Sequence, residues 1–379
     1  MKKLFVCISL ALTAILCLSG CGFGGGGGCS GGGPTTPSYS TVWSNDKSEA
    51  VGLTETLKYS VKYDDNLTVG KSSYQNKIDK SVLDFDYLDG TYQTNISVVQ
   101  ASKDLIGENE SEILTEIVDS TDASMVKRIF KYTTRLDLPF KYKFGEMTDY
   151  VVNNDYIQTE TYMLLTANSF SPIFTKNTTF ITFVGVGKSV TVERQHYDSV
   201  TVYNKKNLST TTTVYYTKDG DGYVSGDVAN SRTTTSKYDF KSVLDNSTLL
   251  FALRALSREG TLPALKVYSH VYTSPKTLTL AGVDPVAEKF NITLNGTTIP
   301  EEEIQLDGYS FVLNTASGCT TGPNTGKAQL VYINKKADTA PASIGSNRPM
   351  VMRYVEPLME YSSYNSMGAL VYSLVEINF

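Results

Sequence analysis

The sequence predicts a mainly β protein of the α+β class, built as a curved antiparallel sheet or half-barrel with a few short helices on its concave side. Three observations favour this fold. Threonine is abundant and 25 tyrosines stand beside a single tryptophan, a balance typical of strands. Long stretches alternate apolar and polar residues with a period of two. Short polar links separate these stretches, which indicates an antiparallel meander.

The first strands are predicted ahead of a short helix. Residues 53–63 (LTETLKYSVKY) have apolar or aromatic side chains at alternate positions. Residues 82–99 indicate two more strands, and we expect Asp89-Gly90 to form a hairpin turn between them. Residues 110–118 (ESEILTEIV) have helical spacing behind an acidic first turn. Further strands are expected at residues 126–138, 140–144, 156–165 and 178–186.

A regular meander is predicted after residue 188, because successive alternating runs are joined by short polar turns. Its strands are expected at residues 190–203, 209–216, 223–228 and 232–240. The remaining strands are expected at residues 264–271, 276–280, 291–294, 310–313, 328–333, 351–354 and 368–377. We expect residues 49–379 to form one body, with a domain boundary near residue 290 as the alternative.

A second helix is predicted between these two sets of strands. Asp245-Asn246-Ser247 is a capping sequence, and Gly260 and Pro263 are expected to end the helix. Four leucines at helical spacing form one apolar stripe on it: Leu249, Leu250, Leu253 and Leu256. The stripe is a candidate wall of a ligand cavity, and the alternative is ordinary core packing.

The N-terminus carries the signature of an exported protein. Lys2 and Lys3 precede an apolar run that is long enough for a secretory signal and too short for a membrane span. The segment Leu18-Ser19-Gly20-Cys21 that follows resembles the lipobox of bacterial lipoproteins. The resemblance implies that residues 1–20 are a signal peptide removed before Cys21.

In such proteins the cysteine thiol carries diacylglycerol, and acyl chains such as palmitate hold the protein on the cell membrane, facing the extracytoplasmic side. Each buried methylene contributes about 0.8 kcal/mol, so two or three acyl chains make a stable anchor. Residues 21–48 are predicted to be a flexible tether, because the run GFGGGGGCSGGGPTTP offers almost nothing to bury.

The net charge argues against one class of partner, and the number of cysteines limits the possible disulfide bonds. Removing the signal removes two lysines and no acid, so the net charge becomes −5 − 2 = −7, which argues against nucleic acid as a partner. Once the signal is removed and Cys21 is acylated, Cys29 and Cys319 remain. A disulfide between them and two separate thiols are both open.

No cofactor or metal is predicted. The run from Thr182 to Ser189 misses the first glycine of a phosphate-binding loop, and a strand pattern follows where a helix is required. Asp219-Gly-Asp-Gly-Tyr223 lacks the ligand positions of a calcium loop and indicates a hairpin turn. Two histidines and two loop cysteines are too few for a dedicated transition-metal site.

One polar cluster is a candidate site. Arg194, His196 and Asp198 are two residues apart and share one face of a predicted strand. Such a cluster could orient the polar head of a ligand, and the alternative is a solvated surface patch. The sequence contains no G-x-S-x-G motif, and we expect no catalytic site and no enzymatic activity.

The body loosely resembles a family of bacterial envelope proteins of unknown function, whose architecture is similar to the half-barrels of the LolA/LolB lipoprotein carriers. The matching residues are Asp245, Leu249, Arg254, Leu256 and Gly260, with Ser171-Pro172 upstream. The resemblance implies an open half-barrel with an apolar cavity that holds acyl chains.

Three functions are therefore considered. The first is a non-enzymatic, membrane-anchored lipoprotein that binds an apolar or amphipathic ligand, such as lipid, in a half-barrel cavity. The second is a structural or interaction lipoprotein that binds a protein or polysaccharide partner in the cell envelope. The third is an envelope hydrolase with its acids gathered around His196.

Overall fold

The computed structural model describes the strands, one helix and several connections of the chain. The described residues are 54–64, 83–99, 129–166, 169–186, 190–204, 209–219, 222–237, 243–256, 262, 264–269, 275–314, 329–334, 349–359 and 366–379. Among them, 17 strands form one large sheet and three form a small one. The mainly β, curved antiparallel sheet that the sequence predicts is confirmed.

The first part of the large sheet is a meander in chain order. Each of its strands is antiparallel to the next. The strands are β3 (Gly90–Val99), β4 (Ile129–Asp137), β7 (Tyr156–Thr166), β8 (Ser169–Val186), β9 (Val190–Asn204), β10 (Ser209–Asp219) and β11 (Gly222–Lys237). Asp219 pairs with Gly222 at the end of the ladder between β10 and β11.

The second part of the sheet runs from β13 to β20, also by antiparallel pairs of neighbours. Its strands are β13 (Ala264–Tyr268), β14 (Lys276–Phe290), β17 (Glu302–Asn314), β18 (Gln329–Asn334), β19 (Val351–Met359) and β20 (Ser366–Asn378). β1 (Thr54–Asp64) pairs with β20 on one side and with β3 on the other. Since β14 pairs with β17, the sheet is continuous across residue 290.

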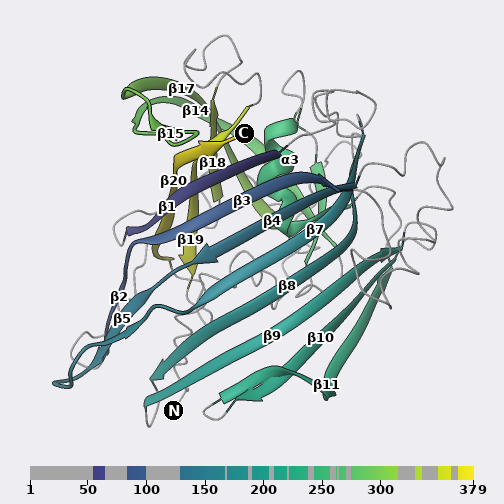
Figure 1. The fold of residues 1–379 in the computed structure, drawn as a ribbon, viewed down its shortest axis with the longest axis vertical. Coiled ribbons are helices and arrows are strands. Elements are labelled where there is room, and N and C mark those ends of the chain that lie inside the picture. The colour runs from purple at the N-terminus through teal and green to yellow at the C-terminus, as the bar shows by residue number, and fades with distance from the viewer. Residues whose placement is uncertain are drawn as a thin grey trace, which may run out of the picture.

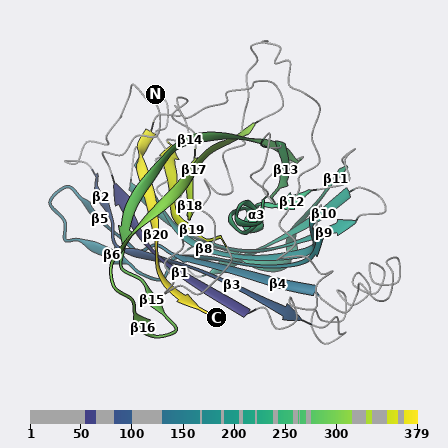
Figure 2. The same cartoon turned by 90° about the horizontal axis from the view of Figure 1, so that it is seen from above.

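The sheet curls around a short helix. β12 (Leu244–Asp245) leads into a 3₁₀ turn (Asn246–Thr248) and then into α3 (Leu249–Ala255). Figure 1 shows the long strands β7, β8 and β9 side by side, and Figure 2 shows α3 inside the curve, with β13 and β14 on its far side. The helix therefore occupies the concave side, as the sequence predicts for this segment.

Alternation decides which side chains face α3. In β1, residues 55, 57, 59 and 61 are buried while the residues between them are half-buried. Phe251 of α3 stacks on Tyr132 of β4 at 5.2 Å between ring centroids and meets Phe170 of β8 edge-on at 5.4 Å. The helix and the inner face of the sheet thus form one continuous hydrophobic core.

The hairpin predicted at Asp89-Gly90 is wrong. β2 (Leu83–Tyr87) pairs with β5 (Phe140–Phe144) in the small sheet, with β6 (Tyr150–Val152) beyond it. β3 pairs with β4, so residues 83–99 run as one long arm against residues 129–144. The Asp-Gly pair lies at a break in this arm, opposite the break at Pro139, where Leu88 N donates to the Pro139 carbonyl at 2.9 Å. An Asp-Gly pair can interrupt a strand as well as reverse it.

Two other expected boundaries are wrong. Strands predicted at 223–228 and 232–240 form one strand, β11, because shifts in register against β10 absorb the break between them. The helix predicted to reach Gly260 ends at Ala255, and Leu256 is extended and buried in the core. Packing outweighs helix propensity in so short a segment. The helix expected at 110–118 and residue Gly260 lie outside the described residues.

β15 (Thr293–Leu294) and β16 (Thr297–Thr298) form a small hairpin at the end of β20. Asn295 and Gly296 at its turn have φ values of 46° and 79°, the pair of left-handed residues that a type I′ turn requires. No helix among the described residues is long and apolar enough to cross a membrane.

Candidate binding site

A cavity lies between α3 and the inner face of the sheet. It offers about 70 Å³ of space to the centres of water-sized molecules. Strands from both parts of the sheet and the segment before α3 contribute its walls. The described residues that line it are Tyr92, Thr134, Leu136, Ile157, Thr159, Thr175, Asn177, Ser199, Thr201, Asp245, Asn246, Ser247, Leu249, Leu250, Ser269, Gln329, Tyr354 and Tyr372.

One wall of the cavity consists of hydroxyl and amide groups. In β8 and β9 the inward positions carry Thr175, Asn177 and Ser199, all buried, while the intervening residues are exposed or half-buried. On the neighbouring strands β4 and β7, the hydroxyl groups of Thr134 and Thr159 lie 2.5 Å apart. One wall of the cavity is therefore polar, beside the apolar and aromatic side chains that line the rest of it.

Asp245 organises the end of the cavity below α3. Its Oδ1 accepts hydrogen bonds from Ser247 N at 2.9 Å and from Ser247 Oγ at 2.6 Å, which caps the 3₁₀ turn as the sequence predicts. Its Oδ2 accepts from Thr175 Oγ1 at 2.8 Å and from the hydroxyl group of Tyr203. One buried carboxylate thus joins the helical segment to β8 and β9.

Two serine hydroxyl groups in the cavity wall have no hydrogen-bond partner within the described part of the chain. Ser199 in β9 is 2% exposed, and Ser269, directly after β13, is 3% exposed. An unsatisfied buried hydroxyl group costs about 1–3 kcal/mol, so such groups are normally paired with protein, water or a ligand. These two hydroxyl groups are free to bind whatever fills the cavity.

The opposite end of the cavity is aromatic. Tyr372 contacts Tyr354 at 5.0 Å and Tyr92 edge-on at 5.5 Å between ring centroids. The hydroxyl group of Tyr354 donates to Gln329 Oε1 at 2.6 Å, and that of Tyr372 donates to Glu356 Oε2 at 2.7 Å. These polar ends are thus occupied within the protein, and the rings bound the cavity with apolar surface.

The four leucines of the stripe separate into two pairs. Leu249 and Leu250 line the cavity. Leu253 and Leu256 are 4% and 6% exposed and pack in the hydrophobic core, outside the residues that line the cavity. The first pair therefore contacts the cavity, and the second pair has a packing role.

The polar cluster lies on the other side of the sheet. His196 and Asp198 of β9 alternate with the inward-facing Ser199, and their side chains are 29% and 47% exposed. Their closest approach is 4.0 Å, and Thr178 Oγ1 donates to Asp198 at 2.8 Å. The side chain of Arg194 lies outside the described residues. His196 and Asp198 therefore face away from the cavity and cannot orient a ligand inside it.

The segment that resembled a phosphate-binding loop enters strand β8, which continues to Val186. The acidic loop at 220–221 lies outside the described residues. In the part of the chain that the structure describes, no group of three His, Cys, Asp or Glu residues is placed to hold a metal ion.

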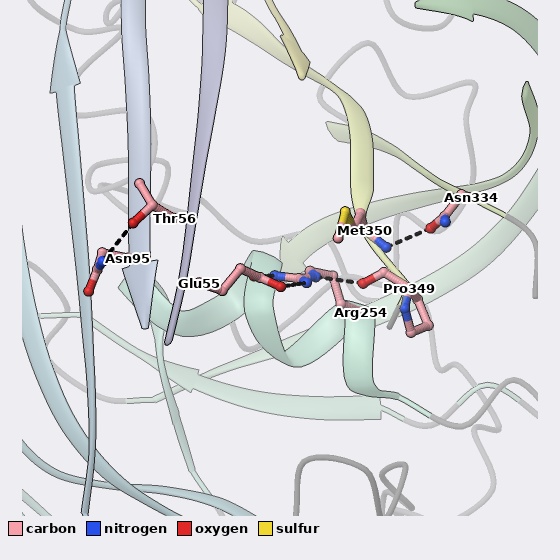
Figure 3. Close-up of polar contacts among 7 residues, drawn as sticks. All are labelled: Glu55, Thr56, Asn95, Arg254, Asn334, Pro349 and Met350. Atoms are coloured by element: carbon pink, nitrogen blue, oxygen red, sulfur yellow. Dashed lines mark hydrogen bonds and ion pairs between the residues drawn. The ribbon is translucent and has the colours of Figure 1, made fainter. Parts of the chain in front are cut away.

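A buried ion pair fixes α3 beside the cavity. Arg254 donates to both carboxylate oxygens of Glu55 in β1, at 2.7 and 3.0 Å, and its Nε donates to the Pro349 carbonyl at 2.7 Å (Figure 3). The side chains of Arg254 and Glu55 are 3% and 1% exposed. Burial alone would lower the pKa of the guanidinium, but the charge and hydrogen bonds of Glu55 hold that pKa above its usual value.

Sequence reasoning missed the hydroxyl wall and the roles of the tyrosines. The alternation of threonine with valine in β9 shows two faces but does not show which face is inside. The sequence predicts the capping role of Asp245 but not its bonds to Thr175 and Tyr203, which span 70 and 42 residues. The signal that could have identified the site is a strand whose inward face is polar while its outward face carries valine.

No protein-family model matches this chain, and no curated protein matches it. Among solved structures, the chain is similar to a beta-barrel-like protein of a domain of unknown function, DUF1849, from Brucella abortus. The two sequences are 7% identical, the match covers 86% of this chain and 98% of the other, and the TM-score is 0.38.

Proposed function

We propose that this protein is a non-enzymatic binding protein that holds one small amphipathic molecule inside its curved sheet. The observation that carries the proposal is the cavity itself, which is lined in part by the start of α3 and contains two buried serine hydroxyl groups without partners among the described residues. Leu249, Leu250 and the tyrosine rings offer apolar contact, and the threonines and serines of β8 and β9 offer hydrogen bonds. A polar wall facing an apolar wall suits a molecule with both characters.

The second part of the proposal concerns location. We infer from the lipobox-like Leu18-Ser19-Gly20-Cys21 that an acylated Cys21 anchors the protein to the cell membrane, with its body on the extracytoplasmic side. Acylation adds a defined mass to the N-terminal peptide, and Cys21→Ser should remove that mass and release the protein from the membrane fraction. A membrane-bound, unmodified Cys21→Ser variant would contradict the anchor.

Native mass spectrometry of the full chain tests the binding role. We expect a co-purified small molecule in the unaltered protein. The variant Ser199→Leu adds an apolar side chain inside the cavity and should exclude this molecule while the protein still unfolds cooperatively. Leu253→Met is the matched control, because it preserves volume at a core position outside the cavity and should retain the molecule.

A clean mass for the unaltered chain, with no binding of small amphiphiles added at millimolar concentration, would refute the binding role. The interaction lipoprotein would then become the better hypothesis. The exposed apolar residues of the small sheet would be its first candidate surface: Met147, Tyr150 and Val151 are 53%, 43% and 59% exposed.

A further inference from the structure

We propose that the molecule bound in the cavity is an amine: a protonated amino group at the Asp245 end, carried on a short apolar body. This inference rests on the binding role proposed above and adds the chemical class of the ligand. It depends on the charge of the cavity, on the direction of its hydrogen bonds, and on the two serines without partners.

The described lining of the cavity contains one carboxyl group. Of the described residues that line it, Asp245 is the only ionisable acid or base other than the tyrosines, and none is lysine, arginine or histidine. Both oxygens of Asp245 are placed to accept hydrogen bonds, from a backbone N–H and three hydroxyl groups. No described residue of the lining is a cation that could pair with this carboxyl group.

The hydroxyl groups around Asp245 are oriented by it. Ser247 and Thr175 each donate their proton to the carboxylate. Thr161 Oγ1 lies 2.7 Å from Ser247 Oγ and 3.1 Å from Thr175 Oγ1, and its single proton can be donated to only one of them. The protons of Ser247 and Thr175 point toward Asp245, so their oxygens can act only as acceptors toward other groups. Such a surface accepts hydrogen bonds, so it prefers a ligand that donates them.

Ser199 and Ser269 provide the independent observation that something binds here. Both are more than nine-tenths buried, line this cavity, and have hydroxyl groups without a hydrogen-bond partner among the described residues. Each hydroxyl group can donate its proton, and its two lone pairs can accept from an ammonium group. An ammonium group has three donors, which match an acceptor-rich surface around a carboxylate.

The same geometry disfavours fatty acids and other anionic lipids. A ligand carboxylate or phosphate would lie near the carboxyl group of Asp245, and two anionic groups at short range repel each other. The apolar body of an amine would contact Leu249, Leu250 and the tyrosine rings, which also attract cations through their faces. The lipid-like ligand expected from the resemblance to carrier half-barrels is thus replaced by a cationic one.

Three probes that share one tail test the head group. Hexylamine, hexanol and hexanoate are titrated into the purified full chain near neutral pH, with binding followed by calorimetry and native mass spectrometry. We expect hexylamine to bind at least tenfold more tightly than hexanol, and hexanoate not to bind. In Asp245→Asn the preference for the amine over the alcohol should fall to less than threefold. Ser199→Ala keeps the charge, so it should weaken hexylamine while preserving its preference over hexanoate.

The outcomes separate the two proposals. Hexanoate or hexanol binding as tightly as hexylamine would overturn the amine and leave the binding role intact. A co-purified molecule without an amino group would do the same, whatever the probes show. No co-purified molecule and no binding of any probe would refute the binding role itself, leaving the serines hydrated by water in the cavity. The comparison on the unaltered chain is valid even if Asp245→Asn fails to fold.

Discussion

Glu356 is a buried acid of β19, and Tyr372 is its one hydrogen-bonding neighbour among the described residues. Its side chain is fully buried on β19, Tyr372 donates to Oε2, and Oε1 has no partner within the described residues. Burial raises the pKa of Glu356 from 4.5 to about 8, although the bond from Tyr372 lowers it. The folded protein therefore keeps this group protonated at neutral pH, whereas the unfolded chain ionises it.

The consequence is a loss of stability as the pH rises. Between the unfolded pKa near 4.5 and the folded pKa near 8, the folded state binds one proton more than the unfolded state, so the free energy of unfolding falls with pH. At about 1.4 kcal/mol per pKa unit, the loss between pH 5 and pH 9 is on the order of a few kcal/mol. Glu356→Gln should remove this slope when unfolding in urea is measured at several pH values.

Glu376→Gln provides the control for that measurement, since Glu376 lies at the surface, with its side chain 35% exposed and 4.0 Å from Lys58. It should follow the pH dependence of the unaltered protein. A Glu356→Gln variant with the same slope as the unaltered protein would show that Glu356 is not the group responsible.

At the scale of an element, α3 depends for its stability on the buried ion pair between Arg254 and Glu55, because the helix itself is short. Seven residues are too few for a stable isolated helix. Arg254→Met would leave the Glu55 carboxylate buried without its cation, and we expect a loss of about 3–5 kcal/mol in the free energy of unfolding. The double variant Glu55→Gln/Arg254→Met should recover part of that loss, because no unpaired charge remains. A double variant less stable than Arg254→Met would contradict this account.

The break in the long β2–β3 arm depends on Gly90. A Cβ atom there would lie 2.6 Å from the carbonyl oxygen of Asp137 and 2.9 Å from Leu138 Cδ1, so the two arms approach too closely for any side chain. Gly90→Ala should therefore destabilise by about 1–3 kcal/mol in thermal or urea unfolding. Gly282→Ala is the matched control: a Cβ there meets nothing within 4 Å, and the change should stay within about 0.5 kcal/mol. Equal effects at the two glycines would disprove the steric explanation.

At the scale of the molecule, the alternation of residues along the sequence predicts most of the strands. The site, in contrast, is formed by contacts between residues that are far apart in the sequence. Strands β1, β9 and β20 could be predicted from their period of two, because successive side chains of a strand point to opposite faces of the sheet. The partner of β2 could not be predicted, since Asp89-Gly90 is compatible both with a hairpin turn and with an interruption of a strand. The cavity could not be predicted from the sequence either. Ser199, Asp245 and Ser269 line it together only because the sheet is curved, and their spacing along the chain does not indicate that curvature.

The position of β1 has a consequence for how the chain is made. This strand is synthesised first among the described strands, yet one of its two neighbours, β20, is synthesised last. A chain that becomes available from its N-terminus can form the meander from β3 to β11 early, but the pairing of β1 with β20 must wait for the last residues. Until then the backbone edge of β1 that pairs with β20 has no partner strand. The unpaired backbone groups of β1 therefore remain exposed until the last strand is available. Such an exposed strand edge favours binding by a chaperone.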